Sequence, residues 1–395
     1  MIRRSENNRL LRPAYLEVDL DILACNIKNI KKRLGRDVEL MTIVKADGYG
    51  HGAYEVAKVA LENGAGSLGV AILEEGIELR ERGIKAPMVN LFPEPPERAE
   101  KVVEYDLDQI ITDLEFVKRL SKEAKKQNKC SNIFIEIDTG LGRYGIPPQE
   151  TIDLVKKIGE LGNIQLKGIF SQFSTADKRK KDFAFHQLSV FKNTLDKLES
   201  FSNHIPIKSI ANSGAVLDIP ASYFNHVMVG HLLYGLYPSM ETSESIKVKP
   251  AMSLKSKVIF IKEVEKGTPI SYGKTYIAKK KTKIATIPLG YADGYSRLLS
   301  NKGEVLIRGK RAKVVGRVCM DAFMVDVSHI PEVKLGDEVV VMGRQGKDEI
   351  TAHDLGKWTN TFAYEIMTRM GKRLPIVYKP RLKTLPLDGG GLGRG

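Results

Sequence analysis

The stretch Leu40-Met41-Thr42-Ile43-Val44-Lys45-Ala46-Asp47-Gly48-Tyr49-Gly50-His51-Gly52 joins an apolar run to a glycine-rich turn. Residues 40–44 are nearly all apolar, and this pattern predicts a strand that is buried on both faces. Residues 53–62 follow the turn and have the amphipathic spacing of a helix. A buried strand, a turn and a helix make one unit of an α/β fold with a parallel sheet.

The same unit recurs along the first part of the chain. Between residues 15 and 240, short apolar runs alternate with helix-like segments such as 74–82 and 187–198. The strand candidates number eight: 40–44, 67–72, 87–92, 109–112, 132–137, 165–170, 208–211 and 226–229. Eight such units predict a TIM-like, eight-stranded α/β barrel with helices outside. No dinucleotide-binding fingerprint follows any of these strands, which disfavours an open doubly wound sheet.

The pattern changes near the polar segment 237–244. Beyond it, short apolar runs are separated by glycine-containing turns: 254–260, 283–287, 305–308, 313–318, 323–327 and 338–342. This spacing predicts a smaller, mostly-β domain. We therefore expect a barrel over residues 12–240 and a β-rich domain over 241–381. Residues 382–395 have too little apolar surface to bury and are expected to form a disordered tail.

Composition limits the classes of function. The net charge is +14, but the basic residues fall in helix-like stretches such as 118–126, and aromatic residues do not alternate with them. Nucleic-acid binding is therefore the remotest alternative. The three cysteines and seven histidines show neither a disulfide framework nor the spacing of metal ligands. With no apolar run long enough for a membrane span and no signal-peptide pattern, we expect a cytoplasmic protein without a metal.

Lys45 is the first candidate for chemistry. It leaves a buried strand at its end, where burial favours the neutral amine. A neutral amine can condense with an aldehyde, so a Schiff base to pyridoxal phosphate is the first hypothesis and proton transfer is the second. The structural alternative is a lysine whose stem packs while its amine reaches water. Glycines at 48, 50 and 52 let the backbone approach a ligand closely, which favours the first hypothesis.

Other polar residues follow the later strands. In a barrel the carboxyl ends of the strands share one face, so these residues are expected to belong to one site. Arg143 lies in a glycine-rich loop after the fifth strand, and Ser213 follows the seventh. The hydroxyl of Ser213 and the amides of Gly230 and His231 would make a phosphate cradle, although Asn-Ser-Gly by itself is more often a simple turn. In the β-rich domain, Tyr272 lies between serine and glycine and could equally be a packing residue.

Several motifs in one order make the chain resemble the PLP-dependent alanine racemases over residues 12–380. They are the Lys45 and Arg143 segments, Asn212-Ser213, Tyr234-Gly235-Leu236, Ser271-Tyr272-Gly273, Gly290-Tyr291-Ala292-Asp293-Gly294, Cys319-Met320-Asp321 and Asn360-Thr361-Phe362-Ala363-Tyr364-Glu365. The resemblance implies a barrel followed by a β domain, and a head-to-tail homodimer in which Tyr272 comes from the other subunit. It also implies interconversion of L- and D-alanine, which supplies D-alanine for cell-wall peptidoglycan.

The resemblance also implies the role of each site residue. Lys45 and Tyr272 would be bases on opposite faces of the α-carbon, Lys45 for the D-isomer and Tyr272 for the L-isomer. The cofactor would be held by Lys45, Tyr49, Arg143, Ser213, Gly230, His231 and Tyr364. The substrate would be bound by Arg143, Met320 and Tyr291. The access corridor would be lined by Asp177, Arg297, Arg317 and Phe362.

The chain departs from the family pattern at one connected feature. Met228 stands where the family has an arginine opposite the pyridine nitrogen, and methionine cannot donate that hydrogen bond. Gln172 and Ser209 replace two histidines of the network around that arginine. Either the electronics of the cofactor ring and the proton handling differ here, or the changes are tolerated drift. Separately, Glu136 replaces a lysine that is often carbamylated, and its carboxylate could orient Arg143 directly.

Three alternatives remain open on the sequence alone. The first is a racemase for another or broader set of amino acids, such as serine, lysine or ornithine. The second is a non-catalytic carrier of pyridoxal phosphate, although such proteins tend to be a barrel without the second domain that holds Tyr272. A decarboxylase that shares the barrel is a less favoured third.

Overall fold

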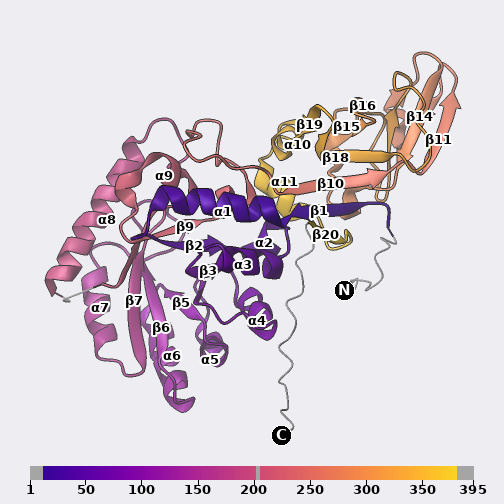
Figure 1. Cartoon of the computed structure of the whole chain (residues 1–395). Coiled ribbons are helices and arrows are strands. Elements are labelled where there is room, and N and C mark those ends of the chain that lie inside the picture. The colour runs from indigo at the N-terminus through magenta and orange to yellow at the C-terminus, as the bar shows by residue number, and fades with distance from the viewer. Residues whose placement is uncertain (1–11, 202–204, 380–395) are drawn as a thin grey trace, which may run out of the picture.

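The computed structural model describes residues 12–201 and 205–379. Figure 1 shows two bodies, a barrel of parallel strands wrapped by helices and a β-rich body beside it. The fold class expected from the sequence is confirmed. The tail expected at 382–395 lies outside the described residues.

The barrel has eight parallel strands in the spatial order β8-β7-β6-β5-β4-β3-β2-β9. Their bounds are β2 (Glu39–Ile43), β3 (Ser67–Val70), β4 (Met88–Asn90), β5 (Asp108–Ile111), β6 (Ser131–Glu136), β7 (Ile164–Phe170), β8 (Ile207–Ser209) and β9 (His226–Val229). An isolated parallel bridge between Ala211 and Val227 joins the two ends of this sheet. There the amide of Met228 donates to the carbonyl of Ala211 at 2.9 Å. The sheet is thus a nearly closed barrel.

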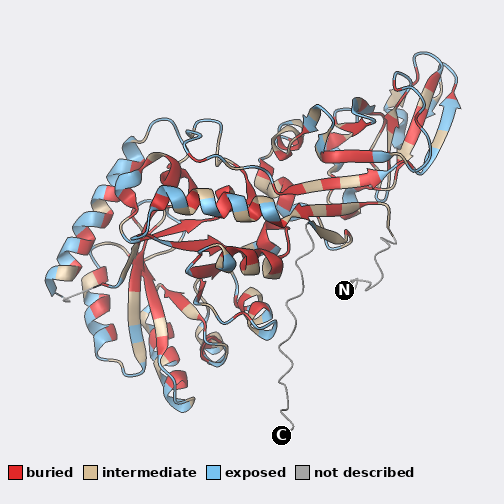
Figure 2. Ribbon diagram, in the orientation of Figure 1, coloured by how far each residue is buried: buried red, intermediate tan, exposed pale blue. Residues whose placement is uncertain are grey.

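Helical segments follow most of these strands along the chain, and the longer helices cover the outside of the barrel with their buried residues turned inward (Figure 2). They are α1 (Leu20–Leu34), α2 (Lys45–Tyr49), α3 (Ala53–Glu62), α4 (Leu73–Glu81), α5 (Ala99–Glu104), α6 (Leu114–Lys126), α7 (Thr151–Gly159), α8 (Asp182–Phe201) and α9 (Ser213–Asp218), with 3-10 turns η1 (Pro96–Arg98), η2 (Pro220–Ser222) and η3 (His231–Tyr234). The ends of the helices follow from local chemistry. The carboxylate of Asp113, for example, caps α6 by accepting from the amide of Phe116 at 2.8 Å.

The β-rich body is built on a second sheet, with the order β11-β14-β17-β16-β15-β18-β10-β1-β20. Its elements are β10 (Met252–Lys257), β11 (Phe260–Val264), β14 (Thr282–Ile287), β15 (Glu304–Ile307), β16 (Lys310–Val314), β17 (Phe323–Asp326), β18 (Glu338–Gln345), β19 (Asp348–Ile350) and β20 (Ile376–Lys379). A hairpin, two helices and three 3-10 turns complete it: β12 (Pro269–Ile270), β13 (Tyr276–Ile277), α10 (Ala352–Thr359), α11 (Ala363–Arg369), η4 (Tyr272–Lys274), η5 (Tyr291–Asp293) and η6 (Arg297–Leu299).

The first strand of the chain, β1 (Tyr15–Asp19), lies in this second sheet and not in the barrel. It pairs antiparallel with β10 and parallel with β20, and Figure 1 shows β1 and β10 side by side. Its alternating burial fits a strand with one covered face. The sequence pattern of this strand does not indicate which sheet it joins, because its partners β10 and β20 lie far along the chain. The domain boundary near residue 240 stays a prediction.

Candidate active site

Lys45 is followed by a turn of left-handed backbone. The chain leaves β2, passes Val44 and enters α2, where φ is 52° at Ala46, 52° at Asp47, 60° at Gly48 and 52° at Tyr49. For a residue with a Cβ this conformation costs about 1–2 kcal/mol. Such strain persists where the surrounding structure fixes it, and it is concentrated at functional sites.

Side chains of the turn itself help to fix this strained backbone. Asp47 Oδ1 accepts a hydrogen bond from the amide of Ala53 at 2.8 Å. His51 Nδ1 lies 3.1 Å from the carbonyl oxygen of Gly48 and 3.0 Å from that of Tyr49. Since both partners are acceptors, Nδ1 carries the proton. Burial lowers the pKa of His51 to about 4, so the ring is neutral at physiological pH. Its Nδ1–H group donates to the backbone of the turn.

The amine of Lys45 lies in a setting that favours its neutral form. Burial lowers the pKa of Lys45, the positive charge of Arg143 lowers it further, and Glu75 acts in the opposite direction. The Nζ atom lies 5.7 Å from the centroid of the Phe92 ring, and the Cζ atom of Arg143 lies 5.3 Å from the same centroid. Both side chains therefore lie near the same aromatic ring. The sequence analysis did not single out Phe92, although its place at the end of the candidate strand 87–92 was the available signal.

Arg143 is held by a second aromatic ring and a buried carboxylate. Its Nη2 donates to Tyr144 Oη at 3.0 Å, and Tyr144 Oη in turn donates to the carbonyl of Leu91 at 2.5 Å. Glu136, the last residue of β6, places Oε1 3.7 Å from Arg143 Nη2. Burial raises the pKa of Glu136 to about 7, while Arg143 opposes that shift. Glu136 can thus change charge near neutral pH while it faces Arg143.

A small cradle forms where the last two barrel strands end. Asn212 Oδ1 accepts from the amides of Gly214 and Ala215 and starts α9, so Ser213 lies at its first position. Ser213 Oγ accepts from the amide of Gly230 at 3.2 Å. A Cβ on Gly230 would lie 2.9 Å from the hydroxyl of Tyr49. The cradle therefore offers a hydroxyl and backbone amides in a space that only glycine leaves open, as a phosphate group requires.

Aromatic rings form one wall of the site. The rings of His231 and Tyr364 stack with centroids 3.5 Å apart, and the ring of Tyr49 lies edge-on to His231 at 5.9 Å. Tyr234 packs against Tyr49 with centroids 4.8 Å apart. Burial raises the pKa of Tyr49 to about 12 and lowers that of His231 to about 3. All these rings are uncharged at neutral pH, which suits a planar cofactor.

Tyr272 lies in a different setting, on the β-rich body. The residue before it, Ser271, has φ 64° and ψ −177°, a conformation almost restricted to glycine. Ser271 Oγ donates to the carbonyl of Arg317 at 2.7 Å, and a Cβ on Gly273 would lie 3.0 Å from the guanidinium carbon of Arg317. Tyr272 is 73% exposed. A strained turn thus presents a tyrosine to the surface.

Tyr291 and Met320 lie near each other on the same body. The amides of Tyr291 and Ala292 donate to the carbonyls of Cys319 and Met320, both at 3.1 Å. Both side chains are exposed, and Arg297 begins η6 a few residues beyond. These contacts link the loops that carry the predicted substrate and corridor residues.

The predicted site residues fall into two groups. The barrel-side group contains Lys45, Tyr49, Arg143, Asp177, Ser213, Gly230, His231, Phe362 and Tyr364. The exposed group contains Tyr272, Tyr291, Arg297, Arg317 and Met320. Within 12–201 and 205–379, no hydrogen bond, ion pair or ring contact joins one group to the other. The candidate residues of one chain thus form two groups that these interactions do not connect.

None of the three residues that depart from the family pattern, Met228, Gln172 and Ser209, carries a charge. Met228 is buried in β9. The carbonyl of Gln172 accepts from Gln187 Nε2 at 3.0 Å, and Ser209 Oγ donates to the carbonyl of His226 at 3.1 Å. The hydroxyl of Ser209 is thus used within the barrel. The hypothesis that these changes alter the cofactor ring stays a prediction.

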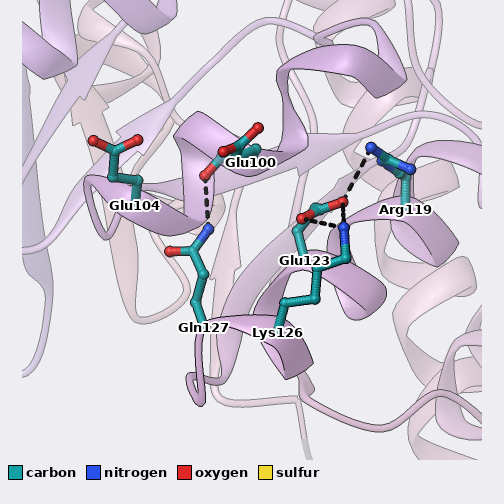
Figure 3. Close-up of a pocket in the computed structure, with 6 residues that line it drawn as sticks. All are labelled: Glu100, Glu104, Arg119, Glu123, Lys126 and Gln127. Atoms are coloured by element: carbon teal, nitrogen blue, oxygen red, sulfur yellow. Dashed lines mark hydrogen bonds and ion pairs between the residues drawn. The ribbon is translucent and has the colours of Figure 1, made fainter.

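A separate hollow of about 410 Å³ lies between the outer helices α5 and α6 (Figure 3). Its carboxylate at Glu123 is already paired with Lys126 at 2.9 Å and with Arg119 at 3.1 Å. None of the residues at the carboxyl ends of the strands lines it, so it is not part of the candidate site. No helix in the described part of the chain is long and apolar enough to cross a membrane.

Comparison with known proteins gives concordant results along the chain. Residues 18–238 match the family described as "Alanine racemase, N-terminal domain", and residues 251–378 match "Alanine racemase, C-terminal domain". A protein of Halothermothrix orenii named alanine racemase is 43% identical over 376 residues, which cover 95% of this chain and 99% of that protein. One from Clostridium perfringens is 45% identical over 371 residues, covering 93% and 96%.

Solved structures agree in fold. An alanine racemase of Clostridium difficile superposes with a TM-score of 0.90 at 38% identity, covering 94% of this chain and 96% of that one. The alanine racemase of Bartonella henselae, solved with covalently bound pyridoxal phosphate, gives a TM-score of 0.83 at 26% identity and covers 93% and 99%.

Proposed function

The chain belongs to the alanine racemase family, and we propose that Lys45 and Tyr272 are the two bases that move the α-proton of alanine. The activity is the interconversion of L- and D-alanine, an isomerisation. The cofactor is pyridoxal phosphate. The roles of the individual residues are what we propose.

The residues present fit this cofactor. The hydrogen bond between Ser213 Oγ and the amide of Gly230 carries the assignment, because it marks a cradle that a Cβ would fill. The phosphate would be held there with the amide of His231, and Lys45 would bind the aldehyde carbon. The rings of Tyr49 and Tyr364 would line the site. When bound, the cofactor withdraws electrons from the α-carbon and so acidifies its proton.

Proton transfer falls to groups on opposite sides. Lys45, whose pKa burial lowers, takes the α-proton of D-alanine as a neutral amine. Tyr272 takes the α-proton of L-alanine. Arg143 would contact the cofactor and the substrate carboxylate, and the backbone of Met320 would add a contact to that carboxylate. Tyr291 narrows the pocket in favour of a small side chain. The access corridor is formed by Asp177, Arg297, Arg317 and Phe362.

The site requires a second copy of the chain. Tyr272 is 73% exposed, and no hydrogen bond, ion pair or ring contact among the described residues joins its group to the Lys45 group. A head-to-tail homodimer would bring Tyr272 of one subunit to Lys45 of the other. We place the enzyme in the cytoplasm, where its unpaired cysteines Cys25, Cys130 and Cys319 would stay reduced. Its D-alanine would enter cell-wall peptidoglycan.

Mixing two inactive variants tests the shared site. Lys45→Ala and Tyr272→Phe subunits are each purified, unfolded together and refolded as a mixture. A mixed dimer would contain one site with both substitutions and one site with neither. Since about half of the dimers are mixed, about a quarter of the wild-type activity should return. The measurement is loss of optical rotation with L-alanine.

The control is each variant refolded alone, which should stay inactive. If Tyr272 acted on Lys45 of its own chain, every site in the mixture would lack one base. Activity would then not return, although the mixed dimer formed, and the proposal would be wrong.

A further inference from the structure

The carboxylate of Glu75 connects the ends of two barrel strands. Its Oε1 accepts from the amide of Ala46 at 2.6 Å, and its Oε2 accepts from the amide of Ala71 at 2.9 Å. Ala46 directly follows Lys45 at the end of β2, and Ala71 follows β3. Glu75 itself lies in the first turn of α4. One side chain thus holds two segments at the catalytic face of the barrel.

A glutamate in the first turn of a helix commonly bonds the amides that precede that helix. The bond to Ala71 is of this kind. The bond to Ala46 is different, because Ala46 belongs to another segment and is the first of five consecutive residues with positive φ. The left-handed turn is therefore fixed at its first amide by a group outside the turn.

We propose that Glu75 is a positioning residue for Lys45, which it serves by anchoring the left-handed turn and by placing a negative charge beside the amine. The charged and titratable groups that face the amine are Arg143, Glu75 and His231. His231 is neutral at physiological pH, so Glu75 is the charge that opposes Arg143. Without it, the positive field of Arg143 would act on the amine without opposition.

The neighbouring residue offers a matched control. Glu74 lies in the same turn of α4, but it is exposed and pairs with Arg98. A Glu74→Gln substitution removes the same charge from the same helix without touching either strand end. Glu75→Ala removes both hydrogen bonds, whereas Glu75→Gln keeps one acceptor and turns a donor towards the other amide.

Hydrogen–deuterium exchange of the holoenzyme is the first readout. We expect the amides of Ala46 and Ala71 to exchange at least tenfold faster in Glu75→Ala, and one of them to do so in Glu75→Gln. Glu74→Gln should leave both unchanged. Unchanged exchange in both Glu75 variants would overturn the proposal. So would equal acceleration in Glu74→Gln. If Glu75→Ala fails to fold, Glu75→Gln decides the question.

Kinetics give the second readout, which rests on the proposed role of Lys45. In Glu75→Gln we expect kcat to fall by roughly ten- to a hundredfold with little change in KM. The acid limb of kcat for D-alanine should move to lower pH, because the lost charge favoured the protonated amine. An unchanged kcat would overturn the positioning role. Absence of racemisation in the wild type would instead reject the proposed function, while exchange would still report on Glu75.

Discussion

The turn after Lys45 and the turn around Tyr272 share a strained backbone but differ in burial and in the side chains that hold them. Both place residues other than glycine at positive φ next to a candidate base. The Lys45 turn is enclosed and is tied by Asp47, His51 and Glu75. The Tyr272 turn is exposed, and the bond from Ser271 to Arg317 is its side-chain anchor. Strained backbone thus lies next to both proposed bases, but only the Lys45 turn is enclosed within its own chain.

The strongest test of the enclosed half is Lys45→Ala. We expect racemisation to fall at least ten-thousandfold, and the bound-cofactor absorbance band to disappear, because the attachment atom and one base are both lost. Absorbance spectra and chiral chromatography measure the two effects. Lys58→Ala, a substitution on the outer helix α3, is the control. Retained activity in Lys45→Ala would contradict the assignment of Lys45 as attachment point and base.

Tyr272→Phe tests the exposed half and should separate the two bases. We expect racemisation to fall by roughly a hundred- to ten-thousandfold while the cofactor band remains. In deuterium oxide, D-alanine should still gain α-deuterium without inversion, since Lys45 serves that isomer, and L-alanine should not. Tyr276→Phe, in the adjoining strand β13, is the control. Exchange of L-alanine at the wild-type rate would contradict the assignment of Tyr272.

Glu136→Gln tests whether the enclosed half depends on pH. Above pH 7 Glu136 is ionised and attracts Arg143, so KM for alanine should rise as the pH falls below 7. In the glutamine variant KM should be roughly tenfold higher, about 1.4 kcal/mol, and independent of pH. Glu150→Gln, an exposed carboxylate beyond the same loop, is the control. Equal KM values for Glu136→Gln and wild type would exclude the role.

The raised pKa of Glu136 also predicts how the free energy of unfolding depends on pH. The pKa of Glu136 rises from 4.5 to about 7 on folding because of burial. A raised pKa stabilises the folded state below pH 4.5, and that contribution is lost as the pH rises to 7. The free energy of unfolding should therefore decline across this window by up to about 3 kcal/mol in the wild type. Chemical denaturation of Glu136→Gln should lack this component.

The smallest expected effect is that of Gly230→Ala. The added Cβ would lie 2.9 Å from the hydroxyl of the buried Tyr49, so the cradle must open slightly. We expect affinity for pyridoxal phosphate to weaken roughly five- to tenfold, measured by equilibrium dialysis. Gly159→Ala, where nothing lies within 4 Å, should leave affinity unchanged. Unaltered affinity in Gly230→Ala would mean that the phosphate lies elsewhere.

The sequence predicted the barrel well because buried parallel strands leave continuous apolar runs. All eight candidates coincide with β2 to β9 to within a few residues. Lys45 and Arg143 were proposed as site residues for the same reason, because each follows one of these apolar runs. Phe92 and Glu75 were not singled out, since an aromatic residue after a strand and an acidic residue at the start of a helix are common. Positive φ at Ser271 was also invisible, because no glycine marks it.

The placement of β1 bears on how the chain matures during synthesis. Its five residues emerge from the ribosome long before their strand partners, because β10 and β20 belong to the β-rich body and lie far downstream in the sequence. All eight barrel strands are synthesised before β10, the first of these two partners. The pairing of β1 with β20 must therefore wait until β20 has been synthesised, so a nascent chain stopped short of β20 would leave an open strand edge that favours aggregation.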